Sequence, residues 1–221
     1  MRVITDRQSG KIGNTVSVLT RYGQVQRRRP VRSKRRTNAQ ARARMDLGRI
    51  SAVWRTLTEE QRAAWHAAAA KVNSRGRLGQ SGPLTGFALF VKINCARAAA
   101  GLSLLTLPPK PAQFRPNPVG PLAITNRRGV IELLLSVPRT PAEHTLVIGS
   151  PPCSAGRSFS CRFAILGLLP APVRRQCNIT DLYVSKYGVP PAGTRVFIRT
   201  RQVIAGWEDD PKETNAIVPR G

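Results

Sequence analysis

A run of positively charged side chains near the N-terminal end is the part of the sequence best suited to binding a ligand. From Gln26 to Arg44 the chain carries nine lysine or arginine residues and no aspartate or glutamate. Arginine pairs with phosphate oxygens through two parallel hydrogen bonds, and lysine adds a point charge. We therefore expect this region to bind the phosphates of a nucleic acid. The expected contact residues are Arg21, Arg27, Arg28, Arg29, Arg32, Lys34, Arg35, Arg36, Arg42, Arg44, Arg75 and Arg77.

The charge of the whole chain supports the same class of partner. The 221 residues include 36 lysines and arginines but only 11 acids, a formal charge of +25. A polyanion would relieve the resulting repulsion. If six charges met phosphates, the logarithm of the affinity would fall with a slope of about −5 against the logarithm of salt concentration. An acidic protein, an anionic membrane surface and a nuclear-localisation signal are alternatives that fit the same composition. So are a solvated flexible arm and a GC-rich genome that places arginine freely on solvated surfaces.

The sequence contains no recognisable catalytic, cofactor-binding or metal-binding motif. Ser9–Thr15 contains Gly-Lys but lacks the spacing of a P-loop, so we predict that its glycines lie in turns. Cys95, Cys153, Cys161 and Cys177 form no C-x-x-C pair and lie far from both histidines in sequence, which argues against a zinc site. We expect a protein that is not an enzyme, has no cofactor and carries free thiols. A disulfide among the last three cysteines is the alternative.

The one acidic cluster lies near the C-terminal end. Gly206–Glu213 includes Asp209 and Asp210 but no further spaced ligands of the kind that calcium loops use. We predict a solvated turn here, which can also pair with the basic face of another copy.

The elements that position the basic run begin with a predicted β-hairpin. Thr15–Arg21 is rich in β-branched residues, Gln24–Arg29 alternates briefly, and Tyr22-Gly23 between them is typical of a tight turn. Pro30 should end the second strand because proline has no amide hydrogen to donate.

Three helices are predicted after the run. Thr37 with Gln40 and Thr58 with Gln61 both form the T-x-x-Q pattern of a capping box, and each precedes apolar residues at helical spacing. A third helix is predicted over Thr85–Leu102, with Gly101 at its C-terminal end. We expect the core of these helices to contain Trp54, Trp65, Phe87 and Phe90.

A proline-rich segment separates the helices from a predicted β region. The predicted divisions are a hairpin and basic arm (1–36), a three-helix region (37–101), a linker (102–121) and a β-domain (122–221). About six short strands with Pro, Gly and Ser turns suggest an antiparallel β-sandwich in the last part. The predicted fold class is α+β, with two domains.

Three resemblances accompany this prediction. The turn Pro191–Thr194 followed by an alternating strand resembles the end of a fibronectin type III domain, a family of spacers and binding scaffolds. Trp54–Ala69 resembles the second half of an HMG box, and Pro83–Phe90 resembles its opening, although the order is permuted. A true HMG relationship would imply binding and bending of DNA at the minor groove. The whole layout is similar to a group of uncharacterised bacterial proteins, some of them phage-derived.

The sequence thus predicts a non-enzymatic protein that binds DNA or RNA without sequence preference, with a β-sandwich as a spacer or protein-contact module. The alternative is a structural or assembly protein, phage-derived or virion-like, whose basic arm docks on an acidic partner, with self-association possible. Met1–Gly10 lacks the apolar segment of a signal peptide, and no stretch approaches ~18 consecutive apolar residues. We therefore expect a cytoplasmic location and no membrane partner.

Overall fold

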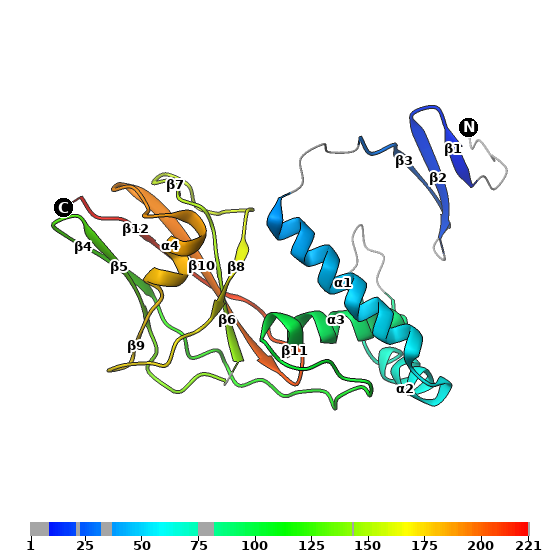
Figure 1. The fold of residues 1–221 in the computed structure, drawn as a ribbon. Coiled ribbons are helices and arrows are strands. Elements are labelled where there is room, and N and C mark those ends of the chain that lie inside the picture. The colour runs from blue at the N-terminus through cyan, green and yellow to red at the C-terminus, as the bar shows by residue number, and fades with distance from the viewer. Residues whose placement is uncertain (1–8, 21–22, 32–36, 75–81, 143, 221) are drawn as a thin grey trace.

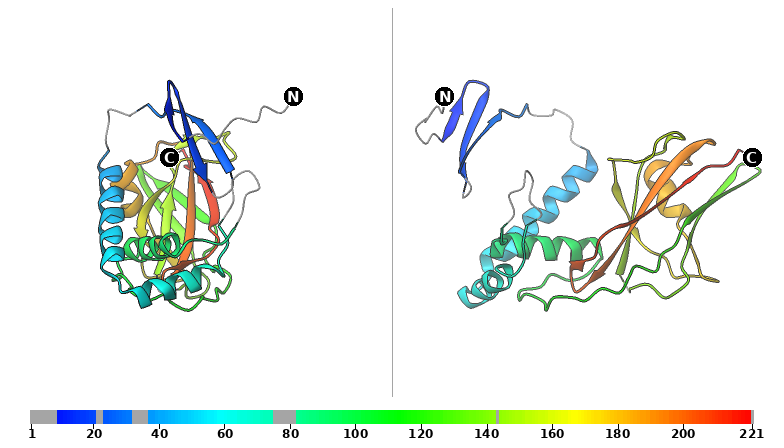
Figure 2. Two further views of the ribbon diagram at one scale, coloured as in Figure 1. Left: turned by 90° about the vertical axis from the view of Figure 1, so that its right-hand side faces the viewer. Right: turned by 180° about the vertical axis from the view of Figure 1, so that it is seen from behind.

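The computed structural model describes residues 9–20, 23–31, 37–74, 82–142 and 144–220. Within these ranges the chain forms four helices and several antiparallel sheets, as the predicted α+β class requires. Figure 1 shows the helices of residues 38–99 gathered beside the larger β part, which carries the remaining helix, while a small N-terminal sheet lies beyond the start of the first helix. The same separation is visible from behind in the right-hand view of Figure 2.

The N-terminal sheet has three strands where two were predicted. Its strands are β1 (Gly10–Ile12), β2 (Thr15–Thr20) and β3 (Gly23–Arg28), paired in chain order. The predicted hairpin corresponds to β2 and β3. The additional strand β1 forms because Gly13-Asn14 makes a two-residue turn between Ile12 and Thr15. Gly13 has φ of 56°, the left-handed conformation that such turns require.

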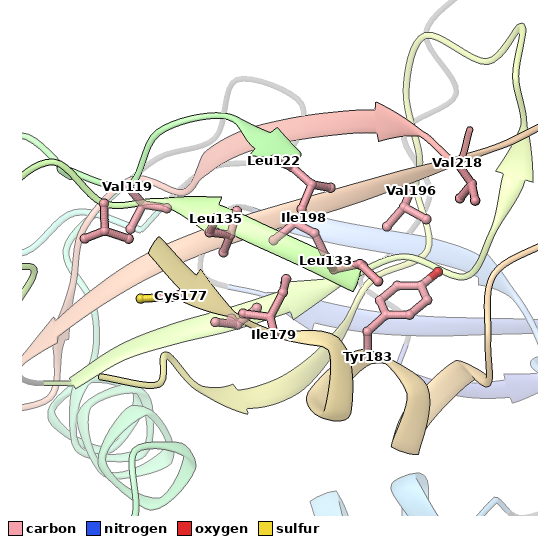
Figure 3. Packing of buried hydrophobic residues seen from close by; sticks show 12 residues of the cluster. Val119, Leu122, Leu133, Leu135, Cys177, Ile179, Tyr183, Val196, Ile198 and Val218 are labelled. Atoms are coloured by element: carbon pink, nitrogen blue, oxygen red, sulfur yellow. The ribbon is translucent and has the colours of Figure 1, made fainter. Parts of the chain in front are cut away.

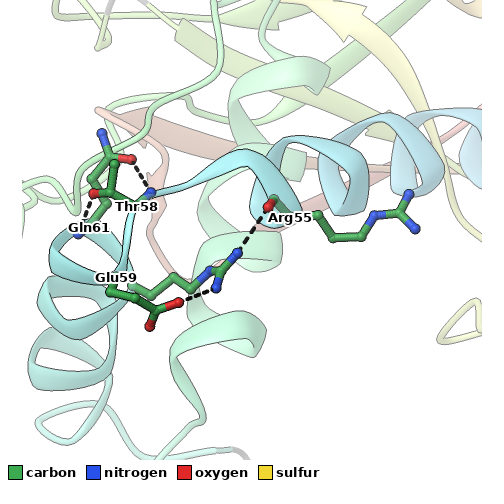
Figure 4. A network of polar contacts seen from close by, with 5 residues as sticks. Arg55, Thr58, Glu59 and Gln61 are labelled. Atoms are coloured by element: carbon green, nitrogen blue, oxygen red, sulfur yellow. Dashed lines mark hydrogen bonds and ion pairs between the residues drawn. The ribbon is translucent and has the colours of Figure 1, made fainter.

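Two capping boxes set the starts of the first two helices. Helix α1 spans Asn38–Thr56 and helix α2 spans Glu59–Ala69. Thr37 accepts from the backbone N–H of Gln40, and Thr58 accepts from that of Gln61, while each glutamine side chain accepts from the backbone N–H of its threonine. Figure 4 shows the second box at the sharp junction between α1 and α2. Both predicted helix starts are confirmed.

The third helix completes a small helical core. Helix α3 spans Gly86–Ala99, and Gly101 after it has φ of 72°, as predicted for a helix end. The fully buried members of this core are Ile50, Trp65, Ala69, Leu89, Phe90 and Ile93. The prediction for Phe87 is wrong, because its side chain is 40% exposed. It lies in the first turn of α3, at the rim of the core, where it covers Trp54 from one side only.

The remaining chain forms two sheets. The first has the order β4-β5-β9, and the second runs β11-β10-β6-β8, with β12 and β7 also paired to β10. Their bounds are β4 Leu122–Arg127, β5 Val130–Ser136, β6 His144–Gly149, β7 Cys153–Ser154, β8 Ala164–Leu168, β9 Gln176–Asn178, β10 Thr194–Ile204, β11 Trp207–Glu208 and β12 Lys212–Ile217.

The two sheets share one hydrophobic core, in a sandwich-like arrangement. Figure 3 shows side chains from β4, β5 and β9 meeting those of β10. Helix α4 (Thr180–Tyr187), which was not predicted, covers part of this core. Its Tyr183 is fully buried and donates to the carbonyl oxygen of Ser150 at 3.0 Å. Strand β8 begins only at Ala164, so residues 157–163 before it are not part of a strand.

The proline-rich segment is hydrogen-bonded to both the helical part and the β part of the molecule. The indole N–H of Trp65 donates to the carbonyl of Thr106 at 2.8 Å, and the Asn94 amide bonds the backbone of Leu105 in both directions. Further along, the Asn117 side chain donates to Thr200 of β10. A third cluster joins the halves directly, and its buried members are Ala96, Ala100, Leu146 and Val203.

The acidic cluster is not the solvated turn that was predicted. Glu208 and Glu213 form ion pairs with Arg201 and Arg199 of β10. Asp209 accepts from both the backbone and the side chain of Gln202. The prediction failed because Glu208 lies on β11 and Glu213 lies on β12, and both strands pair with β10, which brings Arg201 and Arg199 within reach.

Candidate nucleic-acid interface

The register of the N-terminal sheet places two cations in one row across its strands. Lys11 of β1 pairs with Val16 of β2, which pairs with Arg27 of β3. Cross-strand partners share a face of the sheet, so Lys11 and Arg27 project to the same side. Arg29, two residues after Arg27, continues on that face.

These side chains surround a hollow of about 530 Å³. The hollow is lined by Lys11, Asn14, Val16, Arg27, Arg29, Pro30 and Val31. The backbone N–H of Arg29 donates to the carbonyl of Asn14 at 2.6 Å, which extends the ladder one step beyond the last pair of β2 and β3. Pro30 then ends the pairing, as predicted. The hollow is wide enough for a phosphate group, and its three cations come from β1, from β3 and from the residue that directly follows β3.

The described residues of this sheet contain no acidic side chain to balance its positive charge. Residues 9–20 and 23–31 contain four cations, Lys11 and Arg27 to Arg29, and no carboxylate. All four side chains are exposed. Arg28 lies on the opposite face, because it pairs with Thr15 rather than Val16. The structure thus brings Arg27 and Arg29 together and separates Arg28 from them.

Two further predicted residues, Arg42 and Arg44, lie in the exposed first half of α1. Arg42 lines a cleft of about 610 Å³ together with Asp46, Lys186 and parts of α3 and β8. It is therefore aimed at the β part of the molecule, whereas Arg44 lines none of the cavities described here. Neither side chain lines the hollow of the N-terminal sheet.

Seven of the predicted contact residues lie outside the described residues. They are Arg21, Arg32, Lys34, Arg35, Arg36, Arg75 and Arg77. For these the sequence-based expectation stays a prediction.

Lys11 is the member of the row that sequence reasoning missed. We assigned Ser9–Thr15 to turns because of its glycines. The signal that was available is Gly13-Asn14 between Ile12 and Thr15, since a Gly-Asn dipeptide between strand-forming residues favours a two-residue hairpin turn. With that turn in place, Lys11 falls opposite Val16 and hence beside Arg27.

The same sheet exposes an unusual number of apolar side chains. Ile12 is 65% exposed and Leu19 is 49% exposed, both on the face opposite the hollow. Val25 and Val18, a cross-strand pair on the hollow's face, are 44% and 38% exposed. Small sheets need a covered apolar face for independent stability. The sheet therefore offers apolar surface on both faces that a partner could cover.

Three further features of the described residues concern metal sites, disulfides and membrane helices. No group of three or more histidine, cysteine or acidic side chains is placed to hold a metal ion there. All four cysteines lie in the described ranges and are free thiols. No helix in these ranges combines the length and apolar character needed to cross a membrane.

In comparisons with known proteins, the chain matched no family model, no curated protein and no solved structure.

Proposed function

We propose that the protein binds nucleic acid without catalysis, through phosphate contacts made by its N-terminal sheet and the basic segment that follows. The observation that carries this proposal is the hollow lined by Lys11, Arg27 and Arg29, on a sheet without a single carboxylate in its described residues. Cations held in register, on a sheet whose described residues include no carboxylate, are suited to a phosphate backbone, because each phosphate neutralised releases bound counterions.

The rest of the chain fits the role of a scaffold in this proposal. The helices and the β part share buried residues and a fastened proline-rich segment, so they can present the sheet from a firm base. We also propose that the chain has two domains and that its sandwich-like part resembles a fibronectin type III domain. The relationships to an HMG box and to phage-derived bacterial proteins are likewise proposals.

The test replaces Lys11, Arg27 and Arg29 together by glutamine and measures binding to labelled DNA and RNA over a salt series. If each cation meets one phosphate, the log–log salt slope should become shallower by about 2.7 for duplex DNA and about 2.1 for a single strand. The matched control replaces the exposed Lys110, Arg139 and Arg157, which removes the same charge from the scaffold. Equal loss in both variants would overturn the assignment of the site, and no binding by the native protein at low salt would overturn the function.

A second candidate is a structural or assembly protein whose basic sheet docks on an acidic protein. It is favoured by the exposure of Ile12 and Leu19 on the face away from the hollow, since apolar side chains suit a protein interface better than a phosphate backbone. This candidate predicts complexes that survive nuclease treatment and moderate salt, measured by light scattering after chromatography. A monomer at every concentration and in every nuclease-treated lysate fraction would contradict it.

A further inference from the structure

A second, apolar hollow lies on the helical part of the molecule. Its volume is about 410 Å³, and its lining residues are Gly48, Ser51, Trp54 and Arg55 of α1 with Phe87 of α3. The absence of a side chain at Gly48 leaves this hollow open, because a Cβ built there would meet nothing within 4 Å. Phe87 is 40% exposed at its rim.

Neighbouring rings pack against the aromatic wall of the hollow. The Trp54 ring contacts Phe87 with centroids 5.6 Å apart and Phe90 with centroids 5.2 Å apart. His66 packs against a further part of Trp54 at 6.1 Å. Gly86 fits so closely against His66 that a Cβ there would come within 2.9 Å of it, which fixes the start of α3 on α2. Because these neighbours already hold the ring, a ligand would bind without ordering it first.

The charge around the hollow is positive. Of the four arginines of α1, Arg44 and Arg55 lie on the same side of the helix as Gly48, while Arg42 lines the cleft on the other side together with Asp46, the one acid of α1. Asp46 lines the cleft on the α3 and β8 side of the helix, and it precedes Gly48 by two residues, which places it on the opposite side of α1. The nearest acid after α1, Glu59, is paired with Arg62, which also donates to the carbonyl of Arg55. Figure 4 shows this arrangement at the end of α1. Arg55 is the one charged side chain in the lining.

We propose that this hollow receives a base of a single-stranded nucleic acid, stacked on Trp54 and Phe87. The inference rests on the proposed function and narrows its substrate class from nucleic acid in general to an unpaired strand. Aromatic side chains stack on any base, and adjacent arginines hold the backbone, which is the usual combination in single-strand binding. A paired base cannot enter the hollow, because both its faces are covered in the duplex. The arginines of α1 give the phosphates of the same strand a path from Arg55 toward Arg44, about 16 Å along the helix.

The test uses a substitution that fills the hollow and removes no existing side-chain contact. Gly48→Leu places bulk where a Cβ meets nothing, so the variant should fold. The matched control is Ala41→Leu, which adds similar bulk to an exposed position of α1 outside the hollow. Three labelled probes are titrated by fluorescence anisotropy: oligo(dT), an abasic strand of equal length, and a duplex. Oligo(U) in parallel distinguishes RNA from DNA.

We expect Gly48→Leu to weaken oligo(dT) binding by about ten-fold, the loss of one base–aromatic stack. Its binding to the abasic strand should equal that of the native protein, and Ala41→Leu should bind all probes as the native protein does. Binding of oligo(dT) should also quench tryptophan fluorescence in the native protein and not in Gly48→Leu.

Equal affinity of the native protein for the abasic strand and oligo(dT) would overturn this inference and leave the phosphate-binding function standing. Oligo(dT) binding unaffected by Gly48→Leu would overturn it too. So would a change of oligomeric state in Gly48→Leu, which would identify the hollow as a contact between proteins. Failure to bind any of the probes would overturn the inference together with the proposed function.

Discussion

Gly206 lies directly against Ile93. A Cβ at Gly206 would come within 2.6 Å of Ile93 Cγ2 and 2.8 Å of its carbonyl oxygen, and Gly206 has φ of +96°. The pair joins the turn between β10 and β11 to the middle of α3, and Trp207, the next residue, packs against the helical core. The helical and β parts therefore meet at a point where only glycine fits.

We expect Gly206→Ala to lower the free energy of unfolding by about 2 to 4 kcal/mol, because the new methyl group meets backbone atoms that cannot rotate away. Urea denaturation followed by circular dichroism measures this. Gly101→Ala is the control, since Gly101 also has positive φ but open space around it, and should cost about 1 to 2 kcal/mol. Equal losses in the two variants would show that the contact with Ile93 contributes nothing.

The hydrogen bonds between Asp209 and Gln202 have a consequence for pH dependence. Burial raises the pKa of the Asp209 carboxyl above its ordinary value, while the bonds from Gln202 and the charge of Arg201 offset part of this effect. A raised pKa means that the folded state binds the proton more tightly than the unfolded state. The resulting stabilisation is complete below the unfolded pKa of about 4 and is lost as pH rises through the folded-state pKa.

Asp209→Asn removes this titration. We therefore expect the stability of the native protein, relative to Asp209→Asn, to be greater at low pH than at neutral pH. Urea midpoints of both proteins across the acid range measure the difference. A native protein whose relative stability rises from acid to neutral pH would contradict the direction of the pKa shift.

The two capping boxes should differ in their effect on global stability. Thr58 lies at the junction of two helices that pack on the core, so Thr58→Ala should cost about 1 kcal/mol in the free energy of unfolding. Thr37 begins an exposed half-helix, and Thr37→Ala should fray that end and reduce helical circular dichroism while leaving the urea midpoint nearly unchanged. Similar midpoint losses in both variants would show that the first turns of α1 unfold together with the core.

The four thiols should react in an order set by burial. Cys161 is exposed, whereas Cys177 is fully buried and burial raises its pKa. Burial also raises the pKa of Cys95, with smaller contributions from the charges of Asp46 and Glu208. Because the thiolate is the reactive form, iodoacetamide should modify Cys161 first and Cys177 only after unfolding. Mass spectrometry of the labelled peptides reports the order, and Cys161→Ser should abolish the fast phase. Rapid modification of Cys177 in the native protein would contradict the packing of the sandwich core.

Local patterns predicted those elements whose signals lie within a few residues of one another. The T-x-x-Q motifs fixed both helix starts because a capping box is complete within four residues. The hairpin of β4 and β5 turns at Arg128-Gly129, where both residues have positive φ, and the glycine is the local signal of such a turn. Strand β1 was not predicted, because Gly10 and Gly13 were both assigned to turns and Gly13-Asn14 was not recognised as a hairpin turn. Helix α4 was not predicted because it is short. Its Tyr183 packs into a core formed by segments distant in sequence, so no local pattern indicates the helix.

The sequence by itself determined the charge of the N-terminal region, the helix starts and the alternation of the long strand β10, since each depends on residue type and short-range spacing. Only the tertiary structure decided that Lys11 stands beside Arg27, that Glu208 and Glu213 pair with Arg201 and Arg199, and that Trp54 and Phe87 border a hollow at Gly48. The physical reason is that these relationships arise from strand register and helix packing. Both are fixed by burying apolar surface between segments distant in sequence, and a shift of one residue in register would turn Lys11 to the other face of its sheet.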